Sequence, residues 1–401
     1  SILFPNGMTV EKFINDILMT VFFFTVGLEI RREMKNGELS SLKKAMMPVI
    51  AAFGGVVAPA LIFTAINHGS AAASGWGIPT ATDIAFAVGI LSILGDRVPV
   101  SLKVFLTALA IADDLIAILV VALFYGGTIN FGLLSIAFVL IALVLLMNKL
   151  GEKRGWFYLV PAIAIWSLFY YAGIHSTMSG VVMAFLVPMT PRFNEAYFHR
   201  KRLQYIRRLN EYNGIASTSS EFPNGPQRHC LRRLSAISRD SIGMSYRLEH
   251  ALGPWVNFLI MPIFALANAG VEIPDVSYFN VFQFDQVLGS VSMGIFLGLV
   301  LGKPLGISLA SFIAVKLHVG EMPAKSSWPM LIAVACLGGI GFTMSIFVDT
   351  LSFGDQTPEV MARLRDMGKV AVLMGSLFAG ILGSVLINII HGIESRKAVK
   401  A

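Results

Sequence analysis

The chain contains eleven apolar runs that are long enough, or nearly long enough, to cross a membrane as helices. A helix needs about 20 predominantly apolar residues to span the hydrocarbon core of a bilayer. The runs cover residues 13–28, 46–67, 78–94, 104–125, 131–148, 157–172, 175–190, 251–270, 287–315, 328–351 and 368–392. Because helices satisfy their own backbone hydrogen bonds in lipid, the runs predict an all-α polytopic membrane protein.

The composition excludes the other broad classes of protein. Apolar residue types make up 55% of the 401 residues and charged types only 14%, which is too little charge to cover a soluble globule of this size. The 29 phenylalanines exclude a disordered chain. The net charge of +7 suggests nucleic-acid binding at first sight. In a membrane protein, however, basic loops on one side explain it, so we expect no nucleic-acid partner.

The Lys and Arg residues between the runs alternate between rich and poor loops. Of the 31, 26 fall in the loops of one side and one, Lys303, lies inside a run. The other side has only Lys12, Arg363, Arg365 and Lys369. Because cytoplasmic loops carry the excess of positive charge, this split predicts that the rich side and the C-terminus are cytoplasmic.

One sizeable polar segment divides the chain into three parts. We expect seven transmembrane segments over 1–190, a basic cytoplasmic loop over 191–250 and four transmembrane segments over 251–401. The centre of the loop, 217–226, is rich in Ser, Pro, Gly and Asn and predicts a turn between two helical flanks. Its basic patches either meet anionic lipid head groups or simply face solvent.

Two of the runs predict broken helices. The run 78–94 is short and contains Pro79, which lacks a backbone donor. The run 328–351 has three glycines within residues 338–341, and glycine weakens a helix. Short, Gly- or Pro-interrupted segments in transporters surround the substrate site, so we expect breaks in both runs. Tight helix packing at small residues is the alternative explanation of the glycines.

Ionisable residues inside the runs are the candidate functional residues. Asp113 and Asp114 are adjacent, so on a helix their side chains point about 100° apart and cannot face one partner symmetrically. We expect Lys303 to pair with Asp113 and to leave Asp114 for an alkali cation or a proton. A carboxylate that holds a proton and releases it when a cation arrives supplies the chemistry of an exchanger. A buried ion-pair network without a transport role is the alternative.

A third acid lies in the short run. If the helix breaks near Pro79, a half-helix N-terminus presents partial positive charge inside the membrane, and Asp83 can neutralise it. The Thr82 hydroxyl and the freed carbonyls are hard oxygen ligands suited to a small alkali cation. An Asp that only caps a helix is equally compatible with this sequence.

These segments together resemble the NhaA family of bacterial sodium–proton antiporters. The matching motifs occur in order between about residues 8 and 392. They are 22–29 (FFFTVGLE), 81–87 (ATDIAFA), 108–115 (ALAIADDL), 247–250 (RLEH), 254–255 (PW), 302–306 (GKPLG) and 339–345 (GIGFTMS).

The resemblance implies an inverted-repeat transporter in which two discontinuous helices cross near the middle of the membrane. Carried onto this sequence, it implies that Asp113 and Asp114 form the ion and proton site and that Lys303 pairs with Asp113. It also implies that Thr82 lines the site and that Asp83 compensates the half-helix ends. The family exchanges external protons for internal Na⁺ or Li⁺ electrogenically, for pH and sodium homeostasis. Its members are typically homodimers of the bacterial inner membrane. Because they transport ions and catalyse no reaction, the resemblance implies no cofactor and no enzymatic activity.

The resemblance further implies a group of pH-sensing candidates at the cytoplasmic funnel. They are Glu29, Glu33, Glu249 and His250. Ordinary charge at the boundary between loop and membrane is the alternative for all four.

The sequence departs from the family pattern in several places. The family usually has twelve spans, and we expect that the first span, with part of the external hairpin that supports the dimer, is missing here. Gly253 and Tyr246 stand where other members often carry His and Lys, and the 191–250 loop is longer than usual. His175 fits a family motif, either as a satisfied polar group or as a sensor.

Three other functions compete with exchange. An intramembrane aspartyl protease needs two carboxylates that face one water from different helices, whereas Asp113 and Asp114 are sequential. A channel is disfavoured because broken helices around one charged site favour alternating access over an open pore. A symporter of organic solutes needs a larger polar pocket than these runs suggest.

Overall fold

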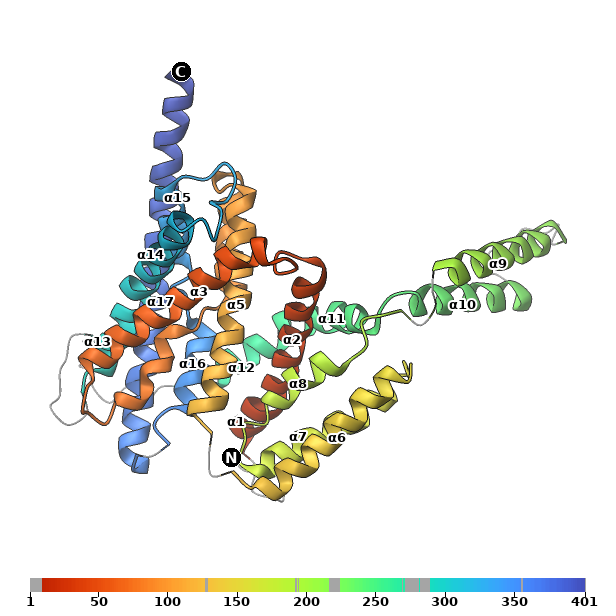
Figure 1. Cartoon of the computed structure of the whole chain (residues 1–401), viewed down its shortest axis with the longest axis horizontal. Helices are drawn as coiled ribbons and strands as arrows, with labels where there is room; N and C mark the ends of the chain where they lie inside the picture. The colour runs from red at the N-terminus through yellow and green to blue at the C-terminus, as the bar shows by residue number, and fades with distance from the viewer. Residues whose placement is uncertain are drawn as a thin grey trace.

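The computed structural model describes residues 9–126, 129–191, 193, 195–215, 224–268, 270, 281, 289–354 and 356–400, and nearly all of them are helical (Figure 1). The helices are α1 (Val10–Phe13), α2 (Met19–Asn36), α3 (Leu42–Ile66), α4 (Ile84–Leu94), α5 (Val100–Phe124), α6 (Phe131–Lys149), α7 (Trp156–Ala172), α8 (Met178–Leu186), α9 (Glu195–Ile215), α10 (Gly225–Asp240), α11 (Met244–Trp255), α12 (Met261–Asn268), α13 (Val291–Leu297), α14 (Lys303–Lys316), α15 (Trp328–Leu337), α16 (Phe342–Leu351) and α17 (Pro358–Lys400). Turns of π-helix join α1 to α2, α11 to α12 and α13 to α14.

The described helices confirm an all-α, multi-pass membrane protein. Within the described residues, eight helical stretches are long and apolar enough to cross a membrane, one of them the interrupted stretch Ala73–Arg97, and the bent pair α15–α16 makes a ninth. Helix α7 has 17 residues and α8 only nine, so α8 alone is about 14 Å long and cannot cross the ~30 Å hydrocarbon core. The division of the chain into eleven spans stays a prediction.

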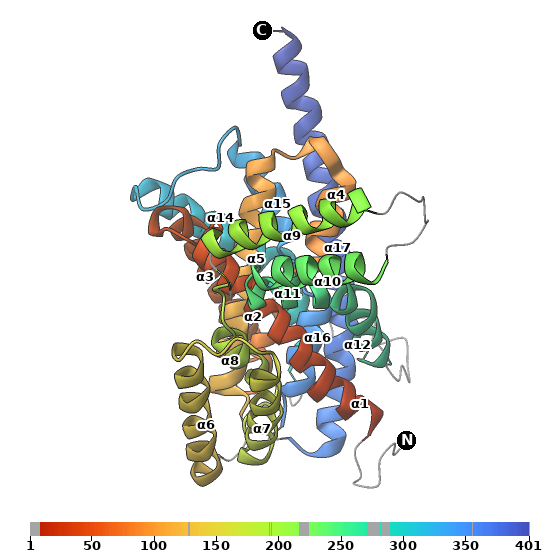
Figure 2. The ribbon, with the colours of Figure 1, turned by 90° about the vertical axis from the view of Figure 1, so that its right-hand side faces the viewer.

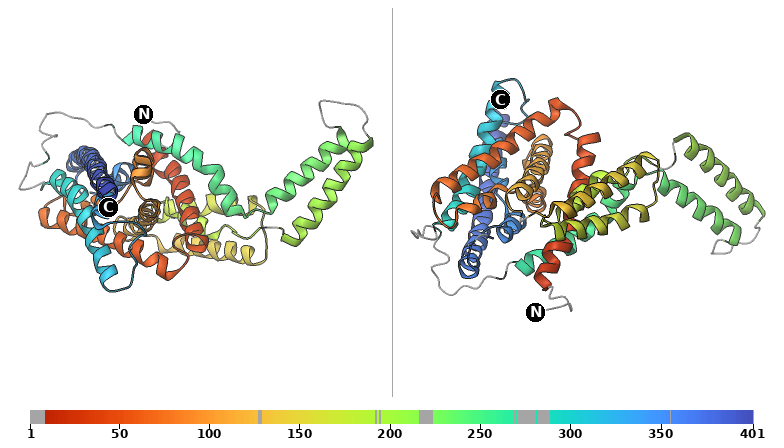
Figure 3. Two further views of the ribbon diagram at one scale, coloured as in Figure 1. Left: turned by 90° about the horizontal axis from the view of Figure 1, so that it is seen from above. Right: turned by 60° about the horizontal axis from the view of Figure 1, so that its bottom comes forward.

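The segment over 191–250 forms a helical hairpin. Helices α9 and α10 pack against each other and project away from the rest of the bundle (green in Figures 1 and 3). The side chain and backbone of Asn224 form a reciprocal capping box with Gln227, which explains where α10 begins. Residues 217–223 of the predicted turn lie outside the described residues, and α11 already begins at Met244.

The backbones of α3 and α14 approach each other closely at two glycines. A Cβ on Gly306 would lie 2.1 Å from the Gly54 carbonyl oxygen, and a Cβ on Gly54 would lie 2.4 Å from that of Gly306. Only glycine fits at both positions, so the two backbones approach as closely as small residues allow in membrane helices. This contact holds α14, whose first residue is Lys303, against the centre of the bundle.

Two spans are broken, and their breaks meet. A 3₁₀ helix, Ala73–Thr80, and three extended residues precede α4, while α15 and α16 are bent by 50° around 338–341. The Asp83 N–H donates to the Ile340 carbonyl at 2.7 Å, which joins the two breaks directly. A Cβ on Gly339 would lie 2.2 Å from the Leu299 carbonyl oxygen, so this glycine serves close packing as well as the break.

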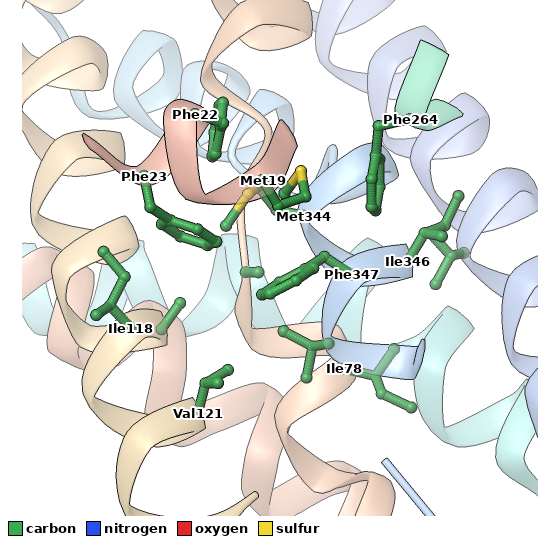
Figure 4. Close-up of a cluster of buried hydrophobic side chains, with 14 of the residues drawn as sticks. Met19, Phe22, Phe23, Ile78, Ile118, Val121, Phe264, Met344, Ile346 and Phe347 are labelled. Carbon is green, nitrogen blue, oxygen red and sulfur yellow. The ribbon is translucent and has the colours of Figure 1, made fainter. Parts of the chain in front are cut away.

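The place where the two breaks, 81–83 and 338–341, meet is called the crossing below. An apolar cluster fills the bundle on one side of it. Figure 4 shows Phe347 of α16 among side chains from the 3₁₀ helix, α2, α5 and α12. The rings of Phe347 and Phe23 are 5.2 Å apart, and Ile118 and Val121 of α5 belong to the same buried cluster. Helix α17 extends beyond the other helices at the end of the bundle opposite α1 (Figure 2).

Candidate functional site

A buried chain of polar groups ties four elements together at the crossing. Lys303 is fully buried, and its Nζ forms an ion pair with Asp113 Oδ2 of α5. The same ammonium donates to Thr82 Oγ1 at 2.8 Å, and the Thr82 hydroxyl donates to the Gly338 carbonyl at 2.7 Å. This hydrogen-bonded network therefore connects α5, α14 and both helix breaks. It leaves one lone pair of the Thr82 hydroxyl oxygen free.

Asp114 lies beside this network with different surroundings. It is 1% exposed, and its Oδ1 has no hydrogen-bond partner. Its carboxyl interacts electrostatically with Asp113, Asp83 and Lys303. The second oxygen of Asp113, Oδ1, is also buried without a partner. Two buried acids thus share one cation, and unpaired charge in a dry interior is costly.

Asp83 accepts hydrogen bonds from the first turns of two half-helices. Its Oδ1 accepts from the Phe86 N–H of α4 at 3.2 Å, as an N-cap residue does. Its Oδ2 accepts from the Thr343 N–H of α16 at 3.1 Å and from the Thr343 hydroxyl. One carboxylate therefore faces the positive dipole ends of α4 and α16 together.

Two residues at this crossing carry no signal that distinguishes them in the sequence. The Ser376 hydroxyl on α17 accepts from the N–H groups of Gly341 and Phe342, at 3.2 and 3.0 Å. Thr343 gives Asp83 its second half-helix partner. Ser and Thr are ordinary residues inside membrane helices, and only the position of the break could have singled them out.

Three of the four pH-sensing candidates gather around one arginine. Arg32 of α2 contacts Glu29 at 3.8 Å, Glu33 at 2.9 Å and Glu249 of α11 at 2.5 Å, measured from nitrogen to oxygen. The Arg32 side chain is 34% exposed, so water reaches this cluster. Sequence reasoning missed Arg32, although its place between Glu29 and Glu33 on one helix was the available signal.

The two histidines named from the sequence lie in different surroundings. His250 is exposed, and its ring packs on that of Tyr246 with centroids 4.1 Å apart, outside the ion pairs of Arg32. Nε2 of His175 lies 2.5 Å from the Tyr125 carbonyl oxygen, so the structure gives this histidine a hydrogen-bond partner.

A cleft opens before Asp114 along α5, and most of the α5 residues of the apolar cluster follow Asp114. The cleft, of about 360 Å³, is lined by α3, α5 and residues 321–324, and it reaches Ala108. By helical rise, Ala108 lies about 9 Å before Asp114, and Ile118 of the apolar cluster lies about 6 Å after it. Buried apolar residues of a second cluster, among them Leu109 and Ala112, lie between Ala108 and the carboxyl pair, so the cleft points toward the pair without reaching it.

Comparison with known proteins gives the same assignment along nearly the whole chain. The family model described as Na⁺/H⁺ antiporter 1 matches residues 3–387. The chain is 42% identical over 377 residues to the Na⁺/H⁺ antiporter NhaA of Syntrophobacter fumaroxidans, which covers 94% of this chain and 78% of that protein. It is 43% identical to NhaA of Pelagibacter ubique, over 95% of this chain and 83% of that protein. It is 41% identical to NhaA of Bacteroides thetaiotaomicron, over 98% and 86%. The chain therefore belongs to the NhaA family of Na⁺/H⁺ antiporters.

Proposed function

We propose that this protein exports Na⁺ in exchange for protons and that Asp114 is the group for which the two cations compete. One observation carries the proposal: Asp114 is buried with an unpartnered oxygen, whereas the adjacent Asp113 is paired with Lys303. A carboxyl in that position must be either protonated or neutralised by a bound cation. Binding of one cation thus displaces the other, and the two fluxes are coupled.

The neighbouring groups complete the ion site. Asp113 Oδ1, the remaining lone pair of Thr82 Oγ1 and backbone carbonyls at the breaks are oxygen ligands for a dehydrated Na⁺ or Li⁺. Lys303 holds Asp113 in the charged form, and Asp83 compensates the dipoles of the half-helices. No cofactor takes part in this scheme.

The positions of the cleft and of the apolar cluster support alternating access. We assign the cleft to the cytoplasmic side, because it lies toward the Lys- and Arg-rich loops. The apolar cluster around Phe347 then closes the external route. Movement of the two broken spans relative to the rest would open that route and close the cleft, as in other inverted-repeat transporters. The exchange is electrogenic when more protons enter than Na⁺ ions leave.

The charge distribution supports the remaining assignments. We propose a bacterial inner-membrane location, with a cytoplasmic C-terminus and a cytoplasmic 191–250 segment between the parts 1–190 and 251–401. The basic hairpin α9–α10 can meet anionic lipids. The proposed functional unit is a homodimer, because members of the family are typically homodimers. The cluster of Glu29, Glu33 and Glu249 around Arg32, with nearby His250, is the candidate pH sensor.

A pH-gradient assay in everted membrane vesicles tests the proposal. Addition of Na⁺ or Li⁺ should collapse a preformed acid-inside gradient in vesicles that contain the protein. Asp114→Asn should abolish the response, because an amide neither releases a proton nor supplies charge to the cation. Asp96→Asn, at an exposed turn, is the matched control and should exchange normally. Normal exchange by Asp114→Asn would refute the assignment of the site.

A further inference from the structure

Asp349 is a further carboxylate inside a span, apart from Asp83, Asp113 and Asp114 at the crossing. It lies near the end of α16 and is completely buried, and neither of its oxygens has a hydrogen-bond partner among the described residues. A Cβ on Gly368 of α17 would lie 2.1 Å from Asp349 Oδ1, so the carboxyl lies against a glycine that leaves room for it. Among the residues that the structure describes, no Lys or Arg nitrogen forms an ion pair with it. Packing alone gives no reason for an acid here.

The charged groups around Asp349 come mainly from α17. Arg365 and Lys369 attract its negative form and Asp366 opposes it, while Tyr125 at the end of α5 lies within electrostatic range. Arg365 donates instead to the Ser352 carbonyl at 3.3 Å, and its own neighbour on α1 is Glu11. Arg365 is therefore near enough to stabilise a charged Asp349 but is engaged elsewhere in this structure.

Asp349 also lies on a polar stripe that leads toward the crossing. Ser345 is four residues before it on the same face of α16, and Ser352, the residue that follows the helix, is three residues after it. Ser345 Oγ is buried without a partner and lies close to Gly341, next to the half-helix terminus that Asp83 holds. The stripe runs from the external half of α16 to the centre, beside the apolar cluster that closes that side to water.

We propose that Asp349 is the external proton-binding site of the exchanger, a relay that takes protons from outside and passes them to Asp114. A proton from external water binds a carboxylate oxygen of Asp349 and gives the neutral acid. The acid then releases the same proton inward past Ser345 and returns to the carboxylate, which Arg365 stabilises until the next proton arrives. A single carboxylate with cations around it is a poor site for Na⁺, so the relay is specific for protons. The inference rests on the proposed function for its direction.

The first test measures exchange against external pH. Na⁺-loaded right-side-out vesicles are diluted into baths of different pH, and Na⁺ efflux is followed. With Asp349→Asn, efflux into a neutral bath should fall by at least about tenfold, a fraction of the ~10²–10⁴ that a positioned proton-transfer group contributes to a rate. Efflux should recover in acid baths, and the half-saturating internal Na⁺ concentration should not change. Asp349→Glu should restore the rate, and Glu359→Gln, at an exposed position on the same side, should match the wild type.

A profile of Asp349→Asn that superimposes on the wild type would overturn the proposal. So would a loss that is equal at every bath pH, because that result indicates a structural role. A second measurement separates this proposal from the proposed function. Infrared difference spectra of the purified protein between acid and alkaline pH should show the carbonyl stretch of buried protonated carboxyl groups. Asp349→Asn should remove one component and Asp114→Asn another. An unchanged spectrum for Asp349→Asn would refute the relay even in a protein that fails to exchange Na⁺.

Discussion

The helix crossing and the cluster around Arg32 are both groups of acids that share one cation, but water reaches only the second. At the crossing, Lys303 and Asp113 are completely buried, whereas the Arg32 side chain is 34% exposed. A buried pair stabilises little by itself but is very costly to break, because the remaining partner is left charged in a dry interior. An exposed pair contributes about 0–1 kcal/mol and is screened by salt. The crossing is therefore suited to coupling ions and the Arg32 cluster to gradual adjustment.

The largest effect is expected from removal of the buried amine. Lys303→Met leaves Asp113 without its partner and should lower the free energy of unfolding by about 3–5 kcal/mol, measured by thermal unfolding in detergent. It should also shift the pH profile of exchange. Adding Asp113→Leu removes the orphaned carboxylate and should recover part of the stability. If Lys303→Met were as stable as the wild type, breaking the buried pair would cost no more than breaking an exposed one, and the contrast between the two regions would be wrong.

A smaller effect is expected at the carboxylate that joins the two half-helices. Asp83→Ala leaves the N–H groups of Phe86 and Thr343 without their acceptor and should cost about 1–3 kcal/mol of stability. Asp83→Asn keeps one acceptor oxygen and should cost less than the Ala variant. Thermal unfolding of the pair measures the difference. Equal stability of both variants would mean that the half-helix ends need no acceptor here.

The effect at the half-buried cluster around Arg32 should be smaller than the effect at Lys303. Arg32→Gln should lower the free energy of unfolding by less than Lys303→Met does, because the Arg32 side chain is 34% exposed, and part of the difference should fade at high salt. The rest comes from Glu249, whose side chain is only 10% exposed and loses its partner. If the cluster is the pH sensor, Arg32→Gln should shift the pH profile of exchange although it changes the stability less than Lys303→Met does. A salt-insensitive loss as large as that of Lys303→Met would show that the two regions do not differ.

The smallest effect is expected at His250. The side chain is exposed and its ring packs on that of Tyr246, so His250→Gln should change stability by less than about 0.5 kcal/mol. A change of the pH profile as large as that of Arg32→Gln would give His250 an independent sensing role. The two variants are compared in the same vesicle assay.

Much of the fold could be predicted from the sequence, because apolar runs predict the membrane-spanning helices and basic loops predict their cytoplasmic ends. The long runs correspond to helices, and Pro79 and the glycines near Gly339 lie at the two breaks. The run 175–190 is itself too short for a full span, in keeping with the short α8, whereas nothing in the sequence predicted the π-helical turns.

The site was partly predictable for the same reason. Charged residues inside apolar runs are conspicuous, and Asp113 and Lys303, 190 residues apart, meet at the crossing. Asp349 lies in the apolar run 328–351 but was overlooked, although the same reasoning would have found it. Thr343 and Ser376 acquire their significance only from the break in the helix, which brings them to unsatisfied backbone groups.

Proton release on Na⁺ binding tests the central claim most directly. Purified protein is titrated with Na⁺ in weakly buffered detergent solution, and the apparent dissociation constant is measured at several pH values. Competition at Asp114 predicts that each bound Na⁺ displaces protons and that the constant rises about tenfold per pH unit on the acid side. Asp114→Asn should release none. Proton release by Asp114→Asn, or Na⁺ affinity of the wild type that does not depend on pH, would contradict the account.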